Sequence, residues 1–317
     1  MAHTLVQCLR QRAPDVSIDV LAPAATAPVA QRMQEVDNIH VVDFQHGELG
    51  LGKRRAVGRG LRGADYDAAF VLPNSWKSAL VPWFAGIPCR TGWSGEARVG
   101  LLNDRRTLDK TRYPLMIERF MALADPAGAL PKSPYPVPVL TADEDNAQLL
   151  AQRFGLGLDG VVVLCPGAEF GPAKKWPVAH FAQLAQRLVD AGRQVWLMGS
   201  PKDAEDAAGI HAAVPDCHNL AGQTSLVDAI DLMSVAEQAV CNDSGLMHVA
   251  CALGVPTVGV FGSTSPGFTP PLGEHAQVVE LSLDCRPCFQ RQCPLGHLNC
   301  LQQLSAQMVW ERLHLGG

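Results

Sequence analysis

The chain has 317 residues, of which 47% are hydrophobic and 18% charged, and its formal net charge is −5. This length is enough for two buried cores, so we expect two domains. The mildly acidic balance gives no sign of a polyanionic partner, and we expect no nucleic-acid binding. The 10 cysteines, without a secretory leader, favour a reducing compartment, and no apolar run is long enough to span a bilayer.

Short apolar runs bounded by turn residues alternate with segments of helical periodicity. In chain order, the predicted strands are 18–21, 40–44, 68–72, 161–164, 195–198 and 257–261. Helical periodicity is clearest in 181–188 and 226–233. This alternation predicts an α/β fold with parallel sheets and helical crossovers.

The segment 125–140 suits an extended connector between two domains. It contains five prolines, at positions 126, 131, 134, 136 and 138. We therefore predict a first domain of residues 1–140 and a second of residues 141–317. Two open parallel sheets facing each other would bind a ligand in a cleft at the carboxyl ends of their strands.

The loop 166–177 follows the predicted strand 161–164, and Pro177 suits the first position of the next helix. Lys174 or Lys175 would then lie beside the cleft. A lysine there can neutralise a diphosphate leaving group without a metal, because stabilising developing charge is often the largest contribution in transfer chemistry. The alternative is a solvated lysine pair at a helix start.

Two further loops follow in the second half. Asp203, after the strand 195–198, could accept hydrogen bonds from ribose hydroxyls, or could be an acid favoured at a helix start. Thr224 or Ser225 would cap the helix 226–233. Capping alone explains that loop, and a place in the wall of a nucleotide pocket would depend on its neighbours.

The loop 242–248 joins the apolar run 239–241 to a helix-like segment, so we expect a strand, a tight loop and a helix start. Asp243 and Ser244 are candidate N-caps, and Gly245 lets the backbone approach a ligand closely. His248 falls on the first turn, beside the exposed amides that attract phosphate. A core or surface histidine is the alternative for His248, but this position favours ligand contact.

Four cysteines cluster near the end of the chain: Cys285, Cys288, Cys293 and Cys300, with His297 among them. Four thiols at these intervals could hold a structural zinc ion tetrahedrally. A compact loop of reduced cysteines is the alternative.

At this point the motifs resemble a known family. The loops 166–177 and 242–250 are similar to those of the ADP-heptose:lipopolysaccharide heptosyltransferases of glycosyltransferase family 9. In the first half, 72–82, 85–93 and 100–104 resemble the members that add the second heptose of the inner core. The similarity covers essentially the whole chain.

The resemblance implies a GT-B fold, with two Rossmann-like domains facing a cleft, the acceptor domain first and the donor domain second. It implies inverting transfer of L-glycero-D-manno-heptose from ADP-heptose to the first heptose of the Kdo-lipid A core. No cofactor would be required for catalysis. The location would be cytoplasmic, with peripheral contact at the cytoplasmic face of the inner membrane.

The resemblance also implies roles for individual residues. The lysine two residues before the tryptophan contacts the donor, which selects Lys174 over Lys175. The donor-binding set is Lys174, Asp203, Thr224, Asp243, Ser244, Gly245 and His248, and Lys174 and Asp243 are the candidate catalytic residues. Basic residues at strand ends of the first domain should bind the acidic acceptor. The acceptor candidates are Asn74, Ser75, Lys77, Arg90 and Arg98, with Arg54, Arg55 and Arg119 as further cations and Trp76 and Trp93 as rings that stack on sugar or pack.

The beginning of the chain departs from the family pattern. Family members start with a strand, a Gly-Asp loop and a helix, and that aspartate is taken as the general base. Residues 1–14 look like this helix, so the strand, loop and base are expected to be missing and the first domain truncated. Since general-base assistance contributes roughly 10²–10⁴-fold, we expect weak or no turnover until such an upstream segment is restored.

Two readings compete with the heptosyltransferase. The first is a noncatalytic nucleotide-sugar-binding protein, which the absent base makes plausible, and the second is a heptosyltransferase of the same family with a different acceptor. A nucleotide-sugar epimerase lacks support because no second acid-base set is found. Turnover with ADP-heptose and a heptosyl-Kdo-lipid A acceptor separates these readings.

Overall fold

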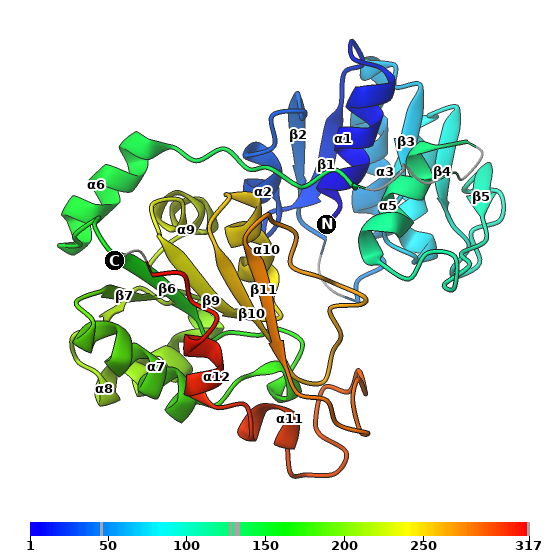
Figure 1. The fold of residues 1–317 in the computed structure, drawn as a ribbon. Coiled ribbons are helices and arrows are strands. Elements are labelled where there is room, and N and C mark those ends of the chain that lie inside the picture. Colours follow the sequence, from blue (N-terminus) through cyan, green and yellow to red (C-terminus); the bar gives the residue numbers. More distant parts are fainter. Residues whose placement is uncertain (45–46, 127–128, 130–133, 316–317) are drawn as a thin grey trace. The chain divides into compact units, whose positions relative to one another are not determined.

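The computed structural model describes residues 1–44, 47–126, 129 and 134–315. It divides into two compact units, Met1–Pro136 and Val137–Gly317. The division falls within the proline-rich segment, a few residues before the position we predicted. Each unit is built from parallel strands connected by helices (Figure 1). Within the described part of the chain, no helix is long and apolar enough to cross a membrane.

Among its described residues, the first unit has five strands in two small parallel sheets. One sheet pairs β1 (Asp19–Pro23) with β2 (Asn38–Val42), and the other has the order β3 (Ala68–Phe70), β4 (Cys89–Trp93) and β5 (Asp104–Arg106). The helices are α1 (His3–Arg12), α2 (Ala27–Gln31), α3 (Leu51–Gly60), α4 (Leu80–Ala85) and α5 (Met116–Ala124), with 3₁₀ turns η1 (Leu61–Ala64) and η2 (Trp76–Ala79).

Two features of the first unit follow directly from its residues. Helices α3 and α4 approach closely because Gly58 has no side chain: a Cβ there would lie 2.6 Å from both Phe84 Cβ and Val81 O. Strands β4 and β5 were not predicted, because their residues, CRTGW and DRR, contain no apolar run.

The second unit contains one six-stranded parallel sheet with the order β11-β10-β9-β6-β7-β8. The strands are β6 (Val161–Cys165), β7 (Gln194–Leu197), β8 (His218–Asn219), β9 (Gln238–Asn242), β10 (Thr257–Phe261) and β11 (Ala276–Glu280). Every residue of β6, β9 and β10 is buried. Helices therefore cover both faces of the sheet, which explains why these strands read as continuous apolar runs.

The helices of the second unit are α6 (Glu144–Phe154), α7 (Val178–Asp190), α8 (Ala204–Ala213), α9 (Leu226–Met233), α10 (Gly245–Ala252), α11 (Asn299–Gln302) and α12 (Ala306–Trp310), with 3₁₀ turns η3 (Pro172–Lys174) and η4 (Pro201–Asp203). In α7 the buried side chains Phe181, Leu184, Ala185 and Leu188 recur at helical spacing and pack against the sheet. Pro177 occupies the N-cap position of α7, one residue before the position we predicted.

The strand order places a topological switch point between β6 and β9. From β6 the chain proceeds to β7 and β8 on one side, and then returns to β9, β10 and β11 on the other side. Cys165 and Cys241, near the carboxyl ends of β6 and β9, are direct partners across the two strands. The loops that begin at Pro166 and Asp243 therefore lie side by side, where open parallel sheets bind ligands.

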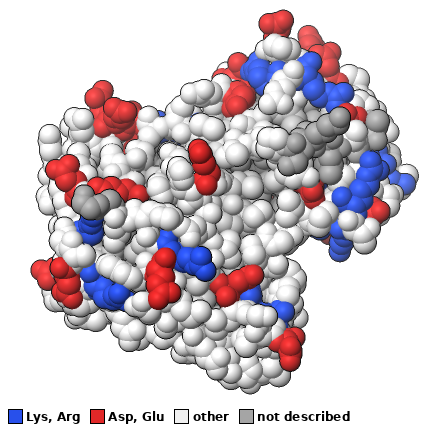
Figure 2. Space-filling model, in the orientation of Figure 1, with Lys and Arg blue, Asp and Glu red and all other residues white. Residues whose placement is uncertain are grey.

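Acidic and basic side chains are interspersed over the visible face of the second unit (Figure 2). Charged side chains of this unit also form ion pairs, such as Lys175 with Asp206 at 2.6 Å and Arg193 with Glu237 at 2.8 Å. Among the described residues, this face therefore carries no extended patch of one sign.

Candidate active site

Asp243 is the central residue at the switch point. Its side chain is only 4% exposed, and its Oδ2 accepts hydrogen bonds from Lys174 Nζ at 2.6 Å and Thr264 Oγ1 at 2.6 Å. Thr269 Oγ1 lies 3.5 Å from the other carboxylate oxygen. The carboxylate is thus held by one cation and two hydroxyls, which compensates for the loss of water around a buried charge.

Lys174 ends the turn η3 and reaches across to the loop after β9. Its ammonium group also donates to the backbone oxygen of Asp243 at 3.3 Å, and lies 5.1 Å from the ring centre of Phe170. An ammonium group has three N–H donors, so two donors directed at Asp243 leave one for a ligand. Lys175 instead pairs with Asp206 of α8 at 2.6 Å, so the two lysines have different partners, and donor contact by Lys174 stays a prediction.

Asn242 joins the two loops beneath this ion pair. Its side chain is fully buried; Nδ2 donates to Pro166 O at 2.7 Å, and Oδ1 accepts from the backbone N–H of Trp176 at 3.0 Å. Trp176 is itself anchored, because its indole N–H donates to Leu304 O at 2.7 Å. The Lys174 loop and the Asp243 loop are therefore positioned as one body.

Helix α10 begins directly after Asp243. Ser244 occupies the N-cap position in extended conformation, but its side chain makes no capping hydrogen bond. Of the two candidate N-caps, Ser244 therefore occupies the position, although without a side-chain hydrogen bond, whereas the Asp243 carboxylate is used by Lys174 and Thr264. Gly245 is exposed, with open space where a Cβ would lie. The positive end of α10 is consequently accessible to an anion.

His248 lies on the first turn of α10 and is half-buried. Burial lowers its pKa to about 4; the Lys174 charge acts in the same direction and the Asp243 charge opposes it. The imidazole is therefore neutral near pH 7 and can both donate and accept a hydrogen bond.

Asp203 and Thr224, the other two predicted donor contacts, lie near helix starts. Asp203 Oδ2 accepts from Ser200 N at 2.9 Å and Ser200 Oγ at 2.7 Å, so the carboxylate serves the helix start, the second of our two readings. It also lies over the loop after β6, because a Cβ on Gly167 would be 2.3 Å from Asp203 Cγ. Ser225, and not Thr224, is the N-cap of α9. Ribose contact by Asp203 and pocket contact by Thr224 stay predictions.

Residues 54–299 match the model of glycosyltransferase family 9 (heptosyltransferase). The chain belongs to this family. It is 45% identical over 325 residues to lipopolysaccharide heptosyltransferase 2 of Salmonella typhimurium, covering 99% of this chain and 93% of that protein. Lipopolysaccharide heptosyltransferase 3 of Escherichia coli is 26% identical over 285 residues, covering 86% of this chain and 81% of that protein.

A solved structure, E. coli ADP-heptose lps heptosyltransferase II, matches with a TM-score of 0.82 and 42% identity, covering 98% of this chain and 95% of that chain. The prediction of an α/β fold with parallel sheets is confirmed by this match to a GT-B glycosyltransferase. The chain is a glycosyltransferase of family 9, and its Lys174–Asp243 pair lies within the matched range.

In this family 9 member, the basic residues predicted to bind the acceptor behave differently from Lys174. Arg98 is fully buried, and its guanidinium donates to Pro73 O at 2.8 Å, to Asn74 Oδ1 at 3.3 Å and to Trp93 O. This corrects the expectation that Arg98 meets the acceptor at the surface. Loop carbonyl groups removed from water need donors, and Arg98 supplies them.

Two further arginines are held in the same way. Arg90 of β4 donates to Leu101 O at 2.6 Å and to Ile87 O, and so joins the segments that precede and follow this strand. Arg54 is 5% exposed, donates to Leu49 O at 2.7 Å and stacks on Phe44 at 4.1 Å. Each of these guanidinium groups has protein partners, which their sequence positions did not reveal.

The remaining acceptor candidates lie nearer to solvent. Asn74 and Arg55 are exposed, Ser75 is half-buried, and Lys77 donates to Glu48 O at 3.2 Å. The two tryptophans also differ. Trp93 is buried, with its indole N–H on Arg119 O at 3.0 Å, whereas Trp76 is 39% exposed. Trp93 therefore packs, and only Trp76 has a ring face available to a sugar.

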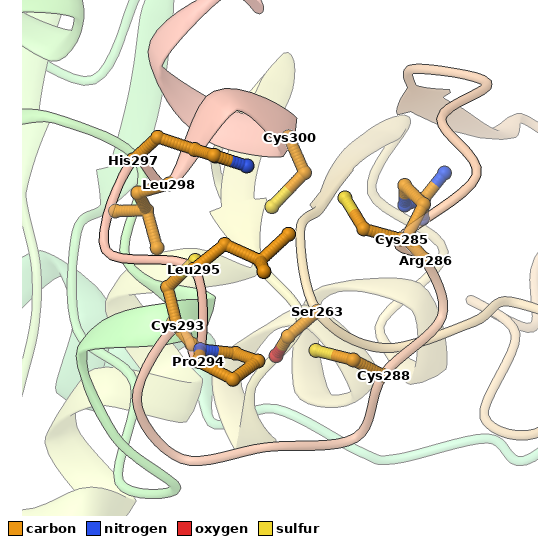
Figure 3. A pocket seen from close by; sticks show the side chains of 11 residues that line it. Ser263, Cys285, Arg286, Cys288, Cys293, Pro294, Leu295, His297, Leu298 and Cys300 are labelled. Atoms are coloured by element: carbon orange, nitrogen blue, oxygen red, sulfur yellow. The ribbon is translucent and has the colours of Figure 1, made fainter.

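We call residues 285–300 the cysteine loop. Its four cysteines are free thiols. Within the described residues, no group of three or more His, Cys, Asp or Glu side chains is arranged to hold a metal ion. The structural zinc that the cysteine spacing allowed is therefore not supported, and the alternative was a compact loop of reduced cysteines. Figure 3 shows the reason: the apolar side chains of Pro294 and Leu295 lie among the sulfur atoms.

Several residues of the site were missed by the sequence analysis. Thr264 and Thr269 contact Asp243 from the loop after β10, and Arg291 of the cysteine loop lies over the Phe170 ring at 5.4 Å, beside Lys174. Only the sheet order brings these loops together. The one available signal was the position of Thr264, just beyond the end of the strand 257–261.

Proposed function

We propose that the chain transfers L-glycero-D-manno-heptose from ADP-heptose to the first heptose of the lipopolysaccharide inner core, with inversion at the anomeric carbon. The names of the relatives support this assignment, and so does the greater identity to heptosyltransferase 2 than to heptosyltransferase 3. The observation that carries it is the buried Lys174–Asp243 ion pair beside the accessible N-terminus of α10.

The donor diphosphate binds at the start of α10. The backbone N–H groups that begin at Gly245 face one phosphate, and the remaining Lys174 donor faces a bridging or terminal oxygen. Asp243 keeps the ammonium group in place through its Oδ2 and its backbone oxygen. Negative charge that develops on the departing ADP is therefore met by groups already oriented toward it.

Neutral His248 and the hydroxyl of Ser244 lie on the same turn and supply hydrogen bonds to the diphosphate or the heptose. Asp203 and Thr224 border the adenosine side of the site, and the Asp203 carboxylate accepts hydrogen bonds from the ribose hydroxyls. In the first unit, Asn74, Ser75 and Lys77 contact the acceptor. Arg98 holds the loop of Asn74 through Pro73 O and Asn74 Oδ1, and Arg90 holds the segment after β4 through Leu101 O. The acceptor hydroxyl attacks the anomeric carbon from the face opposite ADP.

Because the acceptor is a lipid, the protein would bind peripherally at the cytoplasmic face of the inner membrane. This part of the proposal follows from the acceptor and not from an anchoring segment. It also accounts for a first unit whose acceptor residues, Asn74 and Arg55, are exposed.

The experiment is a transfer assay with purified protein, ADP-heptose and two acceptors. Kdo-lipid A carrying one heptose should gain a second heptose, detected by mass spectrometry, with one ADP released for each transfer. Kdo-lipid A without heptose is the matched control and should gain nothing. Transfer to the control acceptor would move the assignment to the first heptose, and ADP binding without transfer to either would favour a noncatalytic nucleotide-sugar-binding protein.

A further inference from the structure

The four thiols of the cysteine loop surround one small cavity. Cys285, Cys288, Cys293 and Cys300 line a space of about 20 Å³, together with Ser263 (Figure 3). Ser263 is 1% exposed, and its hydroxyl has no hydrogen-bond partner. Burial raises the pKa of Cys300; the Arg286 charge opposes this, and the charges of the other three thiols act with burial. The four cysteines thus share one enclosed space.

Cys293 differs from its neighbours in its surroundings. It begins a tight turn, in which Gly296 N donates to Cys293 O at 3.2 Å. Hydrogen bonds from the N–H of Leu298, and then from those of Leu295, Gly296 and His297, lower the pKa of the Cys293 thiol. Cys293 is also half-exposed, whereas Cys300 is buried. A stabilised thiolate with access to solvent is the reactive form of cysteine.

We propose that the cysteine loop is a site of reversible thiol oxidation by a hydroperoxide, in which Cys293 reacts first and a second cysteine lining the same cavity closes the disulfide.

The chemistry balances with hydrogen peroxide as the oxidant. The Cys293 thiolate attacks one peroxide oxygen, the O–O bond breaks, and the departing hydroxide takes a proton and leaves as water. The second cysteine then attacks the sulfenic sulfur, the S–O bond breaks and a second water leaves as the S–S bond forms. The two thiols lose two electrons, and the peroxide gains them.

The cysteine loop is bonded to both halves of the candidate active site. Arg291, between Cys288 and Cys293, accepts a hydrogen bond at its backbone oxygen from Ala173 N at 3.1 Å, next to Lys174. Gly171 packs tightly there, because a Cβ on it would lie 2.6 Å from Arg291 O. On the other side, Arg286 Nη2 donates to the backbone oxygen of Thr264 at 3.0 Å, and the hydroxyl of Thr264 holds Asp243.

Closing a disulfide would therefore move the segments of the cysteine loop that contact the residues next to Lys174 and Asp243. An S–S bond requires the two sulfur atoms to approach to about 2.05 Å, and Leu295 must leave the space between the thiols. Displacing the turn that carries Lys174 weakens a binding site that depends on sub-ångström placement. We therefore expect oxidation to weaken ADP binding by about tenfold, an expectation that rests on the proposed function.

The first experiment tests the thiol chemistry alone, on the full chain. The reduced protein is treated with hydrogen peroxide, blocked with iodoacetamide and mapped by mass spectrometry. We expect a disulfide between Cys293 and Cys285, Cys288 or Cys300, which dithiothreitol reverses. Cys89→Ser, which removes an exposed thiol outside the loop, should keep this disulfide, and Cys293→Ser should lose it.

A second measurement needs no variant. In the reduced wild-type protein at neutral pH, Cys293 should be alkylated faster than Cys89, although Cys89 is the more exposed of the two. Equal or slower alkylation of Cys293 overturns the proposal, as does a failure to form any disulfide within the loop. A loop disulfide that still forms in Cys293→Ser also overturns it.

The link to the active site is tested by calorimetry with ADP on reduced, oxidised and re-reduced protein. The expected result is a loss of affinity on oxidation that dithiothreitol restores. Equal affinity in all three states overturns the link. No ADP binding by the reduced protein contradicts the proposed function instead, and leaves the disulfide mapping to stand by itself.

Discussion

Lys174 in the second unit and Arg98 in the first are both cations in loops near strand ends, and their surroundings differ sharply. Lys174 meets a carboxylate at the accessible start of a helix. Arg98 lies at 0% exposure among loop oxygens, which take its hydrogen bonds. A cation that faces a buried carboxylate beside free helix amides is positioned for a ligand, whereas a cation surrounded by carbonyl groups stabilises its own loop.

The largest expected effect tests the ligand side of this comparison. Lys174→Met should lower kcat/KM for heptose transfer by about 10²–10³-fold, because it removes a preoriented charge from the leaving group. Steady-state kinetics with the heptosylated acceptor measure the loss. Lys175→Met is the matched control and should change kcat/KM little, because Lys175 pairs with Asp206. Equal losses in both variants would erase the distinction between the two lysines.

The structural side of the comparison predicts a change in stability. Arg98→Ala should lower the free energy of unfolding by about 3 kcal/mol, since several loop oxygens lose their donors in a buried place. Urea denaturation followed by fluorescence provides the measurement, with exposed Arg55→Ala as the control. If Arg98→Ala kept full stability and raised KM for the acceptor, the surface role that we have set aside for Arg98 would be restored.

Asn242 tests whether the two loops of the second unit act as one body. Asn242→Ala removes two buried hydrogen bonds and should cost about 2 kcal/mol of unfolding free energy. It should also lower kcat/KM by about tenfold through misplacement of Lys174. Asn219→Ala is the control, because the side-chain oxygen of Asn219, at the end of β8, accepts from Ala221 N only two residues along the chain. Loss of stability without loss of kcat/KM would show that the loops are positioned independently.

His248 provides the smallest expected effect, through pH. Its folded pKa of about 4 lies below the usual value of 6.5, so the unfolded chain binds a proton between these values while the folded chain does not. Stability is therefore present above pH 6.5 and is lost as pH falls toward 4, by roughly 2 kcal/mol from this group. Urea unfolding at pH 7 and pH 5 should show a larger loss for wild type than for His248→Gln. Equal losses would indicate an exposed, ordinary histidine.

How much of the fold can be predicted from the sequence depends on which structural property each residue pattern indicates. Strands buried on both faces, such as β6 and β10, were predicted because their apolar runs are continuous. Strands β4 and β5 were not, because polar residues interrupt their pattern, among them Thr91 and Asp104, which bond to each other across the two strands. Periodicity reports burial, and it does not report which strand lies beside which.

The same limit applies to the site. The loops that carry Lys174 and Asp243 were predicted from strand ends and helix starts, and the structure brings those two side chains together. The contact of Thr264 with Asp243 depends on β10 lying beside β9, which no local pattern indicates. The burial of Arg98 depends on the backbone oxygens of Pro73 and Trp93 and the side-chain oxygen of Asn74, whereas its charge alone predicted a surface position.

The central claim is that the Lys174–Asp243 pair and the start of α10 form the diphosphate site. A crystal structure of the protein with ADP-heptose tests it most directly. We predict a phosphate oxygen within hydrogen-bonding distance of Lys174 Nζ and another facing the backbone N–H of Gly245, with Asp243 still bonded to Lys174. A diphosphate bound elsewhere, with Lys174 and Gly245 both free of it, would contradict the account.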